Sequence, residues 1–340
     1  MTGFGRTLAA LCVAALLAVA ALLLVGPADI GPDRVAAALG SAVGLVEPDS
    51  VPPTERFVVL QLRLPQAVLI ALVGAALACS GAALQATFAN PLADSGVLGV
   101  TGGAALGAVI AVHLGWAERI FLALPLAAFV GAAAAAGLVY VLCFLGGRRP
   151  TTYSLLLTGV AVGSTTVAGV SLVMILVEQH RLAELLFWLV GGVRNQGWDH
   201  VVLAAVPIAA GCGLLLLLHR PLDAMLTGEE HALAVGVNVV RLRLIVLAAV
   251  SLAAGAATAV AGGIGFVGLM VPHMLRRFTG PTADRLLPAS LFAGAAFLSL
   301  CELAARVLPE RFHMHPGILT AFLGGPAFLI LLRRRIGEES

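Results

Sequence analysis

The chain of 340 residues contains no lysine, and all twenty of its basic residues are arginines. A Walker A loop needs the lysine of its GxxxxGK[ST] motif to reach the nucleotide phosphates, and Schiff-base catalysis needs a lysine amine. Neither kind of chemistry can therefore reside in this chain. If ATP hydrolysis drives the protein, it takes place in a partner.

Charged residues of either sign are scarce, at 11% of the chain, whereas soluble globular domains contain about 25%. Hydrophobic residues make up 60%, and the mean hydropathy is +1.03. This composition predicts an integral membrane protein that contacts the lipid bilayer. With a formal net charge of only +2, we expect no nucleic-acid partner.

The CxxC spacing typical of metal and redox sites is also absent. The five cysteines lie inside apolar runs and are interpreted as small buried hydrophobic residues. They are Cys12, Cys79, Cys143, Cys212 and Cys301. His313 and His315 flank Met314 and offer ligands for a metal, but a single His-x-His sequence in a loop is more often simply exposed. We predict no metal site and no cofactor.

Ten apolar runs predict membrane-spanning helices, each of which needs roughly 20 residues to cross about 30 Å of hydrocarbon. They cover residues 8–25, 65–86, 97–112, 120–145, 155–177, 201–218, 244–262, 264–275, 286–308 and 318–332. The eighth is too short to span alone. The first resembles a signal peptide, but no Ala-x-Ala site followed by a soluble domain appears, which favours a retained helix. We predict an all-α polytopic membrane protein with one transmembrane domain, residues 1–340.

Arginines in the short connections indicate the orientation, because cytoplasmic loops carry an excess of positive charge. One side of the ten-span arrangement holds most of them: Arg6, Arg148, Arg149, Arg220, Arg241, Arg243, Arg276, Arg277, Arg285 and residues 333–335. The connections on the opposite side mix arginine with aspartate and glutamate. We expect both termini in the cytoplasm and the chain in the inner membrane of a bacterium.

A pattern of small residues occurs twice at one constant offset. Gly74, Ala78, Gly81, Pro91 and Gly99 correspond to Gly255, Ala259, Gly262, Pro272 and Gly280. Five predicted spans separate the copies, so the second would enter the membrane from the opposite side, as in the inverted repeats of transporters. We predict a duplicated unit at about residues 60–180 and 240–335. The alternative is a chance match, because alanine and glycine are abundant in this chain.

The helix pattern of the second run stops at Asn90 and Pro91. Pro91 has no amide proton and disfavours the helical conformation at the residue before it. Backbone released at membrane depth has to face protein or water, because lipid cannot form hydrogen bonds with it. The break therefore favours a transport pathway.

Several sequence motifs, which follow one another in the family's order along most of the chain, resemble those of the FecCD family of permeases. They are ANPLADSGVLG (89–99), LLLTGVAVGS (155–164), FWLVGGV (187–193), LTGEEHALAVGVNV (226–239), GGIGFVGLMVPHMLRRFTGPTADRLLP (262–288) and HPGILTAFLGGPAFLILLRRR (315–335). The resemblance implies the ten-helix type II ABC importer permease fold and import of an iron siderophore, haem or cobalamin by a subunit that is not an enzyme. It also implies a second permease subunit, the same or a related chain, with two ABC ATPase subunits and an extracytoplasmic solute-binding protein.

Two other functions compete with this one. A secondary transporter driven by an ion gradient would need charged groups midway across several spans, and only the region of Glu302 approaches that. An intramembrane enzyme would need a nucleophile with a base, or clustered metal ligands, and no HExxH motif occurs in the sequence.

The resemblance assigns the cytoplasmic gate to Asn90 and Leu92, with Thr152 at a second constriction. An amide beside a bulky apolar side chain can close a pore, although Asn90 can equally satisfy the backbone of a turn. Ser164 and Thr165 bring hydroxyls into a span that lines the pathway in this family. Such hydroxyls can also bond back to the preceding helical turn.

The longest cytoplasmic connection contains the pattern of a short helix, in which Gly228 leads, acidic residues occupy the first turn and Gly236 closes. In the family this region fits a groove of the ATPase. We therefore assign Gly228, Glu229, Ala232 and Gly236 to the coupling contact. An ordinary solvated loop with one helical turn is the alternative.

On the outer side, Arg63 and Arg306 match arginines that receive glutamates of the solute-binding protein in the family. Gln66 replaces another such arginine, which weakens or moves one anchor, because a guanidinium binds a carboxylate more strongly than an amide does. Glu302 stands four residues before Arg306, the favourable order for a helical ion pair. For Arg63, snorkelling to the membrane interface is the alternative.

Overall fold

The computed structural model describes residues 2–26, 28–47, 50–96, 99–120, 122–145, 152–193, 196–308 and 314–338. Within these ranges it consists of helices and contains no strand, which confirms the predicted all-α class. The first part of the chain forms α1 (Thr2–Leu24), α2 (Pro32–Ala42), α3 (Pro53–Phe57), the π-helix η2 (Val58–Arg63) and α4 (Leu64–Thr87). The middle forms α5 (Val100–His113), α6 (Trp116–Arg119), α7 (Ala123–Leu145), α8 (Thr152–Leu176), α9 (Gln179–Val190) and α10 (Trp198–Leu217). The last part forms α11 (His219–Leu226), α12 (Glu229–Ala234), α13 (Val239–Ala261), α14 (Val267–Thr279), α15 (Ala283–Val307) and α16 (Pro316–Glu338).

Each of the predicted spans corresponds to one helix, in the order α1, α4, α5, α7, α8, α10, α13, α14, α15 and α16. Among the described residues, 7 helices are long and apolar enough to cross a membrane. Two of the others are short, with 14 residues in α5 and 13 in α14. The third span begins at Val100, later than predicted, because Gly99 adopts a left-handed conformation with a φ of 75°.

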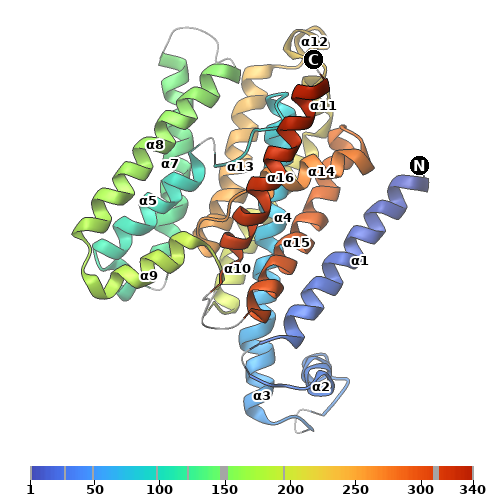
Figure 1. Ribbon diagram of the computed structural model, residues 1–340, viewed down its shortest axis with the longest axis vertical. Coiled ribbons are helices and arrows are strands. Elements are labelled where there is room, and N and C mark those ends of the chain that lie inside the picture. The colour runs from blue at the N-terminus through green and yellow to red at the C-terminus, as the bar shows by residue number, and fades with distance from the viewer. Residues whose placement is uncertain are drawn as a thin grey trace.

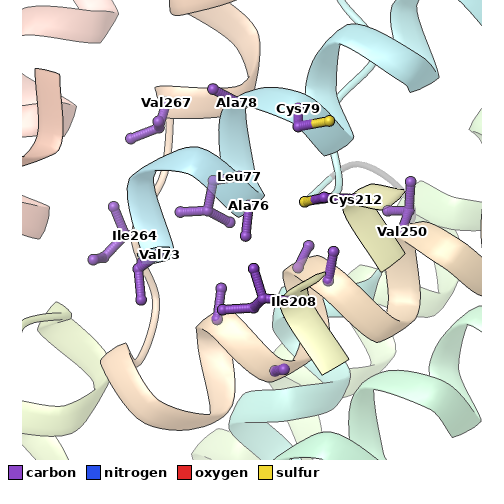
Figure 2. Packing of buried hydrophobic residues seen from close by; sticks show 14 of the residues in the cluster. Val73, Ala76, Leu77, Ala78, Cys79, Ile208, Cys212, Val250, Ile264 and Val267 are labelled. Carbon is purple, nitrogen blue, oxygen red and sulfur yellow. The ribbon is translucent and has the colours of Figure 1, made fainter. Parts of the chain in front are cut away.

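Helices α4 and α13 form the centre of the bundle (Figure 1). In the most apolar stretch of each of these helices, 78% is buried inside the protein, whereas the corresponding share in α1 and α8 is 22%. Helix α4 packs against α10, α13, α14 and α15, and α13 also packs against α7 and α10. Figure 2 shows Leu77 and Cys79 of α4 near Ile208 and Cys212 of α10. A helix that is apolar on all sides is typical of such a buried position.

Glycines allow α4 to approach its neighbours closely. A Cβ atom on Gly74 would lie 2.2 Å from the carbonyl oxygen of Gly294 in α15, and one on Gly81 would lie 1.9 Å from the carbonyl oxygen of Gly268 in α14. Both distances are far below van der Waals contact. These glycines therefore set the spacing of α4, α14 and α15, as small residues do at membrane helix contacts.

The two ends of the bundle differ (Figure 1). The C-terminus lies near α11 and α12, and the N-terminus lies at the tip of α1 at the same end of the bundle, which we call the α12 end. Helices α2 and α3 project at the opposite end, which we call the α2 end. The functional residues expected from the sequence fall at these two ends and on α8.

Candidate gate, coupling and docking sites

The gate turn, residues 88–93, follows α4 at the α12 end. The backbone N–H of Asn90 donates to the carbonyl of Gln85 at 3.1 Å, and the Asn90 side-chain oxygen accepts from the N–H of Leu92 at 3.0 Å. Ala89 has a φ of 45°, a region that alanine seldom adopts. Asn90 thus caps a strained turn, while the Leu92 side chain is 41% exposed and can meet another surface. Thr152 is the first residue of α8, and its side chain lies outside the described part of the structure.

Gln85 is a polar residue near the gate turn that the sequence analysis missed. Its side chain is fully buried. The amide nitrogen donates to the carbonyls of Gly268 and Leu269, both at 3.1 Å, and the amide oxygen accepts from Arg276 at 3.2 Å. All three partners belong to α14. A single amide in an apolar run requires buried partners, and this was the signal available in the sequence.

A cavity of about 410 Å³ borders the Gln85 side chain at the α12 end. It is lined by Gln85, Ala89, Pro91, Asp223, Leu226, Thr227, Arg276, Pro281 and Thr282. The carboxylate of Asp223 in α11 accepts from the N–H of Ala283, the first residue of α15, and so satisfies a donor that a helix start leaves unpaired. The cavity therefore lies where the gate turn, α11 and the α14–α15 connection meet.

Asp94 lies in the connection between α4 and α5, against the start of α14. A Cβ atom on Gly268 would be 2.3 Å from its Oδ1 atom. Burial raises the pKa of Asp94 above its usual value, whereas the N–H groups of Ser95 and Gly96 and the Ser95 hydroxyl stabilise the carboxylate and oppose this change. The N-terminus of a helix also favours a negative charge. Asp94 thus packs against Gly268 of α14, while its hydrogen bonds stay within the gate connection.

The predicted short helix in the longest connection of the α12 end is present as α12. Gly228 precedes it with a φ of 109°, and Gly236 follows it with a φ of 85°, both unfavourable for residues with a Cβ atom. Glu229 pairs with Arg243 of α13 at 2.8 Å, and the Arg243 side chain is only 3% exposed. Ala232 is fully buried. In this chain it packs inside the protein, so its contribution to the predicted coupling contact is to hold α12 in place.

The exposed apolar side chains of the α12 region belong to residues that were not among the predicted coupling residues. Leu233 is 45% exposed and Val235 is 58% exposed, and Glu230 and His231 are exposed beside them. Glu229 and Ala232 therefore fasten α12 to α13, while Leu233 and Val235 form its outer surface. The sequence pattern gave the helix but not its rotation, because both faces of this short segment contain apolar residues.

The two predicted docking arginines at the α2 end are turned toward the protein. Arg63 is 4% exposed and donates to the carbonyls of Leu23, at 2.8 Å, and Ala28. Arg306 donates to the carbonyls of Leu22 at 3.1 Å and Val25 at 3.3 Å. The last carbonyls of a helix lack partners within the helix, and a positive charge there is favourable. Arg63 and Arg306 thus fix the end of α1.

The predicted ion pair within α15 is confirmed. Arg306 Nε lies 2.8 Å from Glu302 Oε1, and the two side chains are 13% and 9% exposed. Gln66 of α4 accepts from Arg306 at 3.4 Å. An amide at this position can accept from the guanidinium, whereas an arginine there would place a further positive charge beside Arg63 and Arg306.

Ser164 and Thr165 are exposed on α8. The Thr165 hydroxyl donates to the carbonyl of Ala161 at 2.9 Å, one turn earlier, which is the alternative that the sequence left open. Helix α8 packs mainly against α5 and α7. Its exposed side, with both residues, is therefore available to lipid or to another subunit.

Three of the strings that carried the family resemblance meet in the structure, at glycines near the break between α13 and α14. Gly192 donates its N–H to the carbonyl of Ala261 at 2.8 Å, and Gly317 donates to Gly191 at 3.3 Å. A Cβ atom on Gly262 would lie 1.9 Å from the carbonyl oxygen of Trp188. The end of α9 is thus held against both the α13–α14 break and the start of α16.

The described residues contain no group of three His, Cys, Asp or Glu side chains placed to hold a metal ion. His315 is 4% exposed, and His313 lies outside the described residues. Cys79, Cys143, Cys212 and Cys301 are buried and Cys12 is half-buried.

The chain matches the model of the FecCD transport family over residues 5–334. The chain belongs to this family. The Cobalamin import system permease protein BtuC of Halobacterium salinarum is 42% identical to it over 285 residues, which cover 84% of this chain and 76% of that protein. The Fe(3+)-citrate import system permease protein YfmE of Bacillus subtilis is 38% identical over 277 residues, or 82% of each chain.

A solved structure in an inward-facing conformation, assigned to the metal-chelate type of ABC transporters, has the same fold. The TM-score is 0.84 at 27% sequence identity, and the match covers 97% of this chain and 99% of that chain. This FecCD permease is therefore a multi-pass membrane subunit of the ABC importer class, which is not enzymatic in itself. The comparisons do not favour the alternative of a secondary transporter.

Proposed function

We propose that this FecCD permease imports an iron siderophore, or another large chelate such as haem or cobalamin, in a complex with two ABC ATPase subunits. The observation that carries the proposal is the match over nearly the whole chain to a family whose members include permeases named for cobalamin and iron(III)-citrate import. An extracytoplasmic solute-binding protein delivers the chelate. A second permease subunit, the same or a related chain, completes the pathway.

The α12 end faces the cytoplasm in this proposal, in the inner membrane of a bacterium. The C-terminus lies near α12, and the N-terminus lies at the same end of the bundle (Figure 1). The arginine-rich connections fall on this side, in agreement with the excess of positive charge in cytoplasmic loops. Helices α2 and α3 then lie on the outer side, where the binding protein docks.

The ATPase contacts the α12 region in this proposal. Leu233 and Val235 are exposed apolar residues between the turns at Gly228 and Gly236, and such residues are favourable at the buried centre of an interface. The ion pair of Glu229 with Arg243 ties α12 to α13. A displacement of the ATPase would thus pass to α13 and to the centre of the bundle.

The gate and the pathway lie at the surfaces of the gate turn and of α8. Leu92 is the exposed apolar residue of the gate turn, Asn90 fixes its conformation, and Thr152 starts α8. Ser164 and Thr165 belong to the side of α8 that the rest of this chain leaves exposed. We assign this side to the interface with the second permease subunit, where its hydroxyls and apolar side chains would let a bulky chelate pass without binding it tightly.

In this proposal Arg63 and Arg306 contribute to docking indirectly, because they fix the segment on which the binding protein rests. They hold the end of α1 through its last carbonyls, and α2 follows shortly after in the chain. The binding protein would rest on the outer segment that these arginines fix, near the exposed Arg34, which pairs with Glu55.

We also propose that the chain contains the duplicated unit predicted from the sequence. Helix α4 packs against α15 as α13 packs against α7. Helix α5 packs against α7 and α8 as α14 packs against α15 and α16. In the two proposed units, residues of about 60–180 and 240–335, helices α4, α5, α7 and α8 correspond to α13, α14, α15 and α16. Corresponding helices therefore make corresponding contacts, as expected for an inverted repeat.

The test of the function is transport by the complete importer. The permease is reconstituted in vesicles with its ATPase and its binding protein, and radiolabelled iron(III)-citrate, haemin and cyanocobalamin are compared as solutes. ATP-dependent accumulation of one of them supports the proposal. Accumulation by the permease alone, driven by an ion gradient, would contradict it.

A further inference from the structure

Pro272 leaves a backbone acceptor without its usual partner in α14. In an α-helix the carbonyl of each residue accepts from the N–H four residues later. The carbonyl of Gly268 would accept from residue 272, but proline has no N–H group. Gly268 is buried, so bulk water does not replace the missing donor.

Gln85 of α4 supplies that donor. Its amide nitrogen donates to the carbonyl of Gly268 and to that of Leu269, both at 3.1 Å. Its amide oxygen accepts from Arg276, two turns further along α14. One fully buried side chain therefore spans the part of α14 that Pro272 interrupts, and both its donor and its acceptor groups are used.

The backbone of Gln85 holds the gate turn. Its carbonyl accepts from the N–H of Asn90 at 3.1 Å, and the Asn90 side chain in turn fixes Leu92. A movement of α14 relative to α4 therefore acts on Gln85, whose carbonyl forms the hydrogen bond that holds the gate turn. The cavity of about 410 Å³ beside Gln85, Ala89 and Pro91 leaves space for the turn to move.

Helix α14 is connected to the coupling region as well. It leads directly into α15, whose first residue, Ala283, donates its N–H to Asp223 of α11. Helix α11 packs against α12 and α15. A continuous series of contacts thus runs from the proposed ATPase surface through α11 and the α14–α15 connection to Gln85.

We propose that Gln85 is the positioning residue that transmits the movement of α14 to the gate turn. The inference rests on the proposed gate and coupling surface, and it adds the residue that joins them. Gln85 touches neither the transported chelate nor the ATPase. Its side chain makes the position of the gate turn depend on that of α14.

The experiment compares three variants in the complete importer. Gln85→Leu removes the hydrogen bonds between the Gln85 side chain and α14. Gln85→Leu with Pro272→Ala also removes them, but gives the carbonyl of Gly268 a backbone donor within α14. Thr87→Val is the matched control, because Thr87 lies in the same helix and is fully buried, and its hydroxyl donates to the carbonyl of Ala83 in its own helix. The readouts are the Tm, ATP hydrolysis and the uptake of radiolabelled iron(III)-citrate, haemin or cyanocobalamin, whichever the parent imports.

A merely structural role and a positioning role give different results. For Gln85→Leu we expect a lower Tm and at least a tenfold loss of uptake per ATP hydrolysed. The double variant should recover the Tm but not the uptake per ATP, while Thr87→Val keeps the parent ratio. Recovery of both quantities in the double variant, or an unchanged ratio in Gln85→Leu, would overturn the inference.

A second measurement separates this inference from the proposed gate. A cysteine in place of Leu92 is labelled with a membrane-impermeant maleimide, with and without a non-hydrolysable ATP analogue, and a parent without this cysteine gives the background. We expect a nucleotide-dependent change in labelling rate of several fold that Gln85→Leu abolishes. No change in the Leu92→Cys protein itself would refute the gate assignment, whereas the same change with and without Gln85 would refute only the role of Gln85.

Discussion

Replacing Gly81 by alanine would act directly on the contact between α4 and α14. The new Cβ atom would lie 1.9 Å from the carbonyl oxygen of Gly268 and 2.5 Å from its Cα atom, whereas carbon atoms in contact are about 3.5–4.0 Å apart. Both groups are backbone, so no rotamer change relieves the clash. The two helices have to separate by about 1.5 Å.

The cost of this separation can be estimated. Overpacking of a core by a methyl group costs about 1–3 kcal/mol, and each kcal/mol lowers the Tm of a domain of a few hundred residues by roughly 2–4 °C. The separation would also stretch the bonds from Gln85 to Gly268 and Leu269, now at 3.1 Å, past the usual limit of about 3.5 Å. We therefore expect a Tm lower by several degrees and reduced uptake per ATP.

The assay is thermal unfolding of the purified permease in detergent, followed by transport in vesicles. Gly213→Ala is the matched control, because Gly213 lies inside α10 and a Cβ atom there would meet nothing within 4 Å. Alanine at that place should be neutral or stabilising by up to about 1 kcal/mol. Equal Tm values for the two variants would refute the reasoning that α4 and α14 are in backbone contact.

Three further predictions concern the two ends of the molecule. Glu302→Gln leaves Arg306 buried without its ion-pair partner and should cost about 3–5 kcal/mol, measured as a fall in Tm that Glu47→Gln, an exposed change at the same end, does not cause. Leu233→Asp should weaken ATPase association by about tenfold or more in a pull-down without changing the Tm, since Leu233 is 45% exposed; equal capture would remove Leu233 from the interface. Gly236→Val forces a β-branched residue to a φ of 85°, so ATP hydrolysis should continue while uptake falls, and unchanged uptake would show that the α12 turn does not transmit force.

The arrangement along the chain was largely predictable because it depends on local properties. Apolar runs of sufficient length give the spans, and proline and glycine mark the breaks at Asn90 and before Val267. The pair of Glu302 and Arg306 followed from a spacing of four residues in one helix, and the structure confirms it. The helix α12 likewise followed from its flanking glycines and its acidic first turn.

What could not be predicted depends on which helices become neighbours. Gln85 meets α14 across a separation of 183 residues, and Arg63 meets the end of α1 across 40 residues. Because α4, like most of the long helices, is apolar on all sides, no hydrophobic stripe indicates which of its faces meets a given neighbour. The inward position of Ala232 and the outward position of Leu233 could not be predicted because apolar residues lie on both faces of the short helix α12.

In the proposed orientation, the cavity beside the gate turn also offers a way to block the permease from the cytoplasmic side. Its volume of about 410 Å³ falls within the range of small-molecule sites, and its lining combines apolar residues with Asp223 and Arg276. A fragment-sized compound wedged there would hold the turn and α14 in one arrangement. Such an inhibitor would need no chemical likeness to the transported solute, and an excess of that solute would fail to displace it by competition.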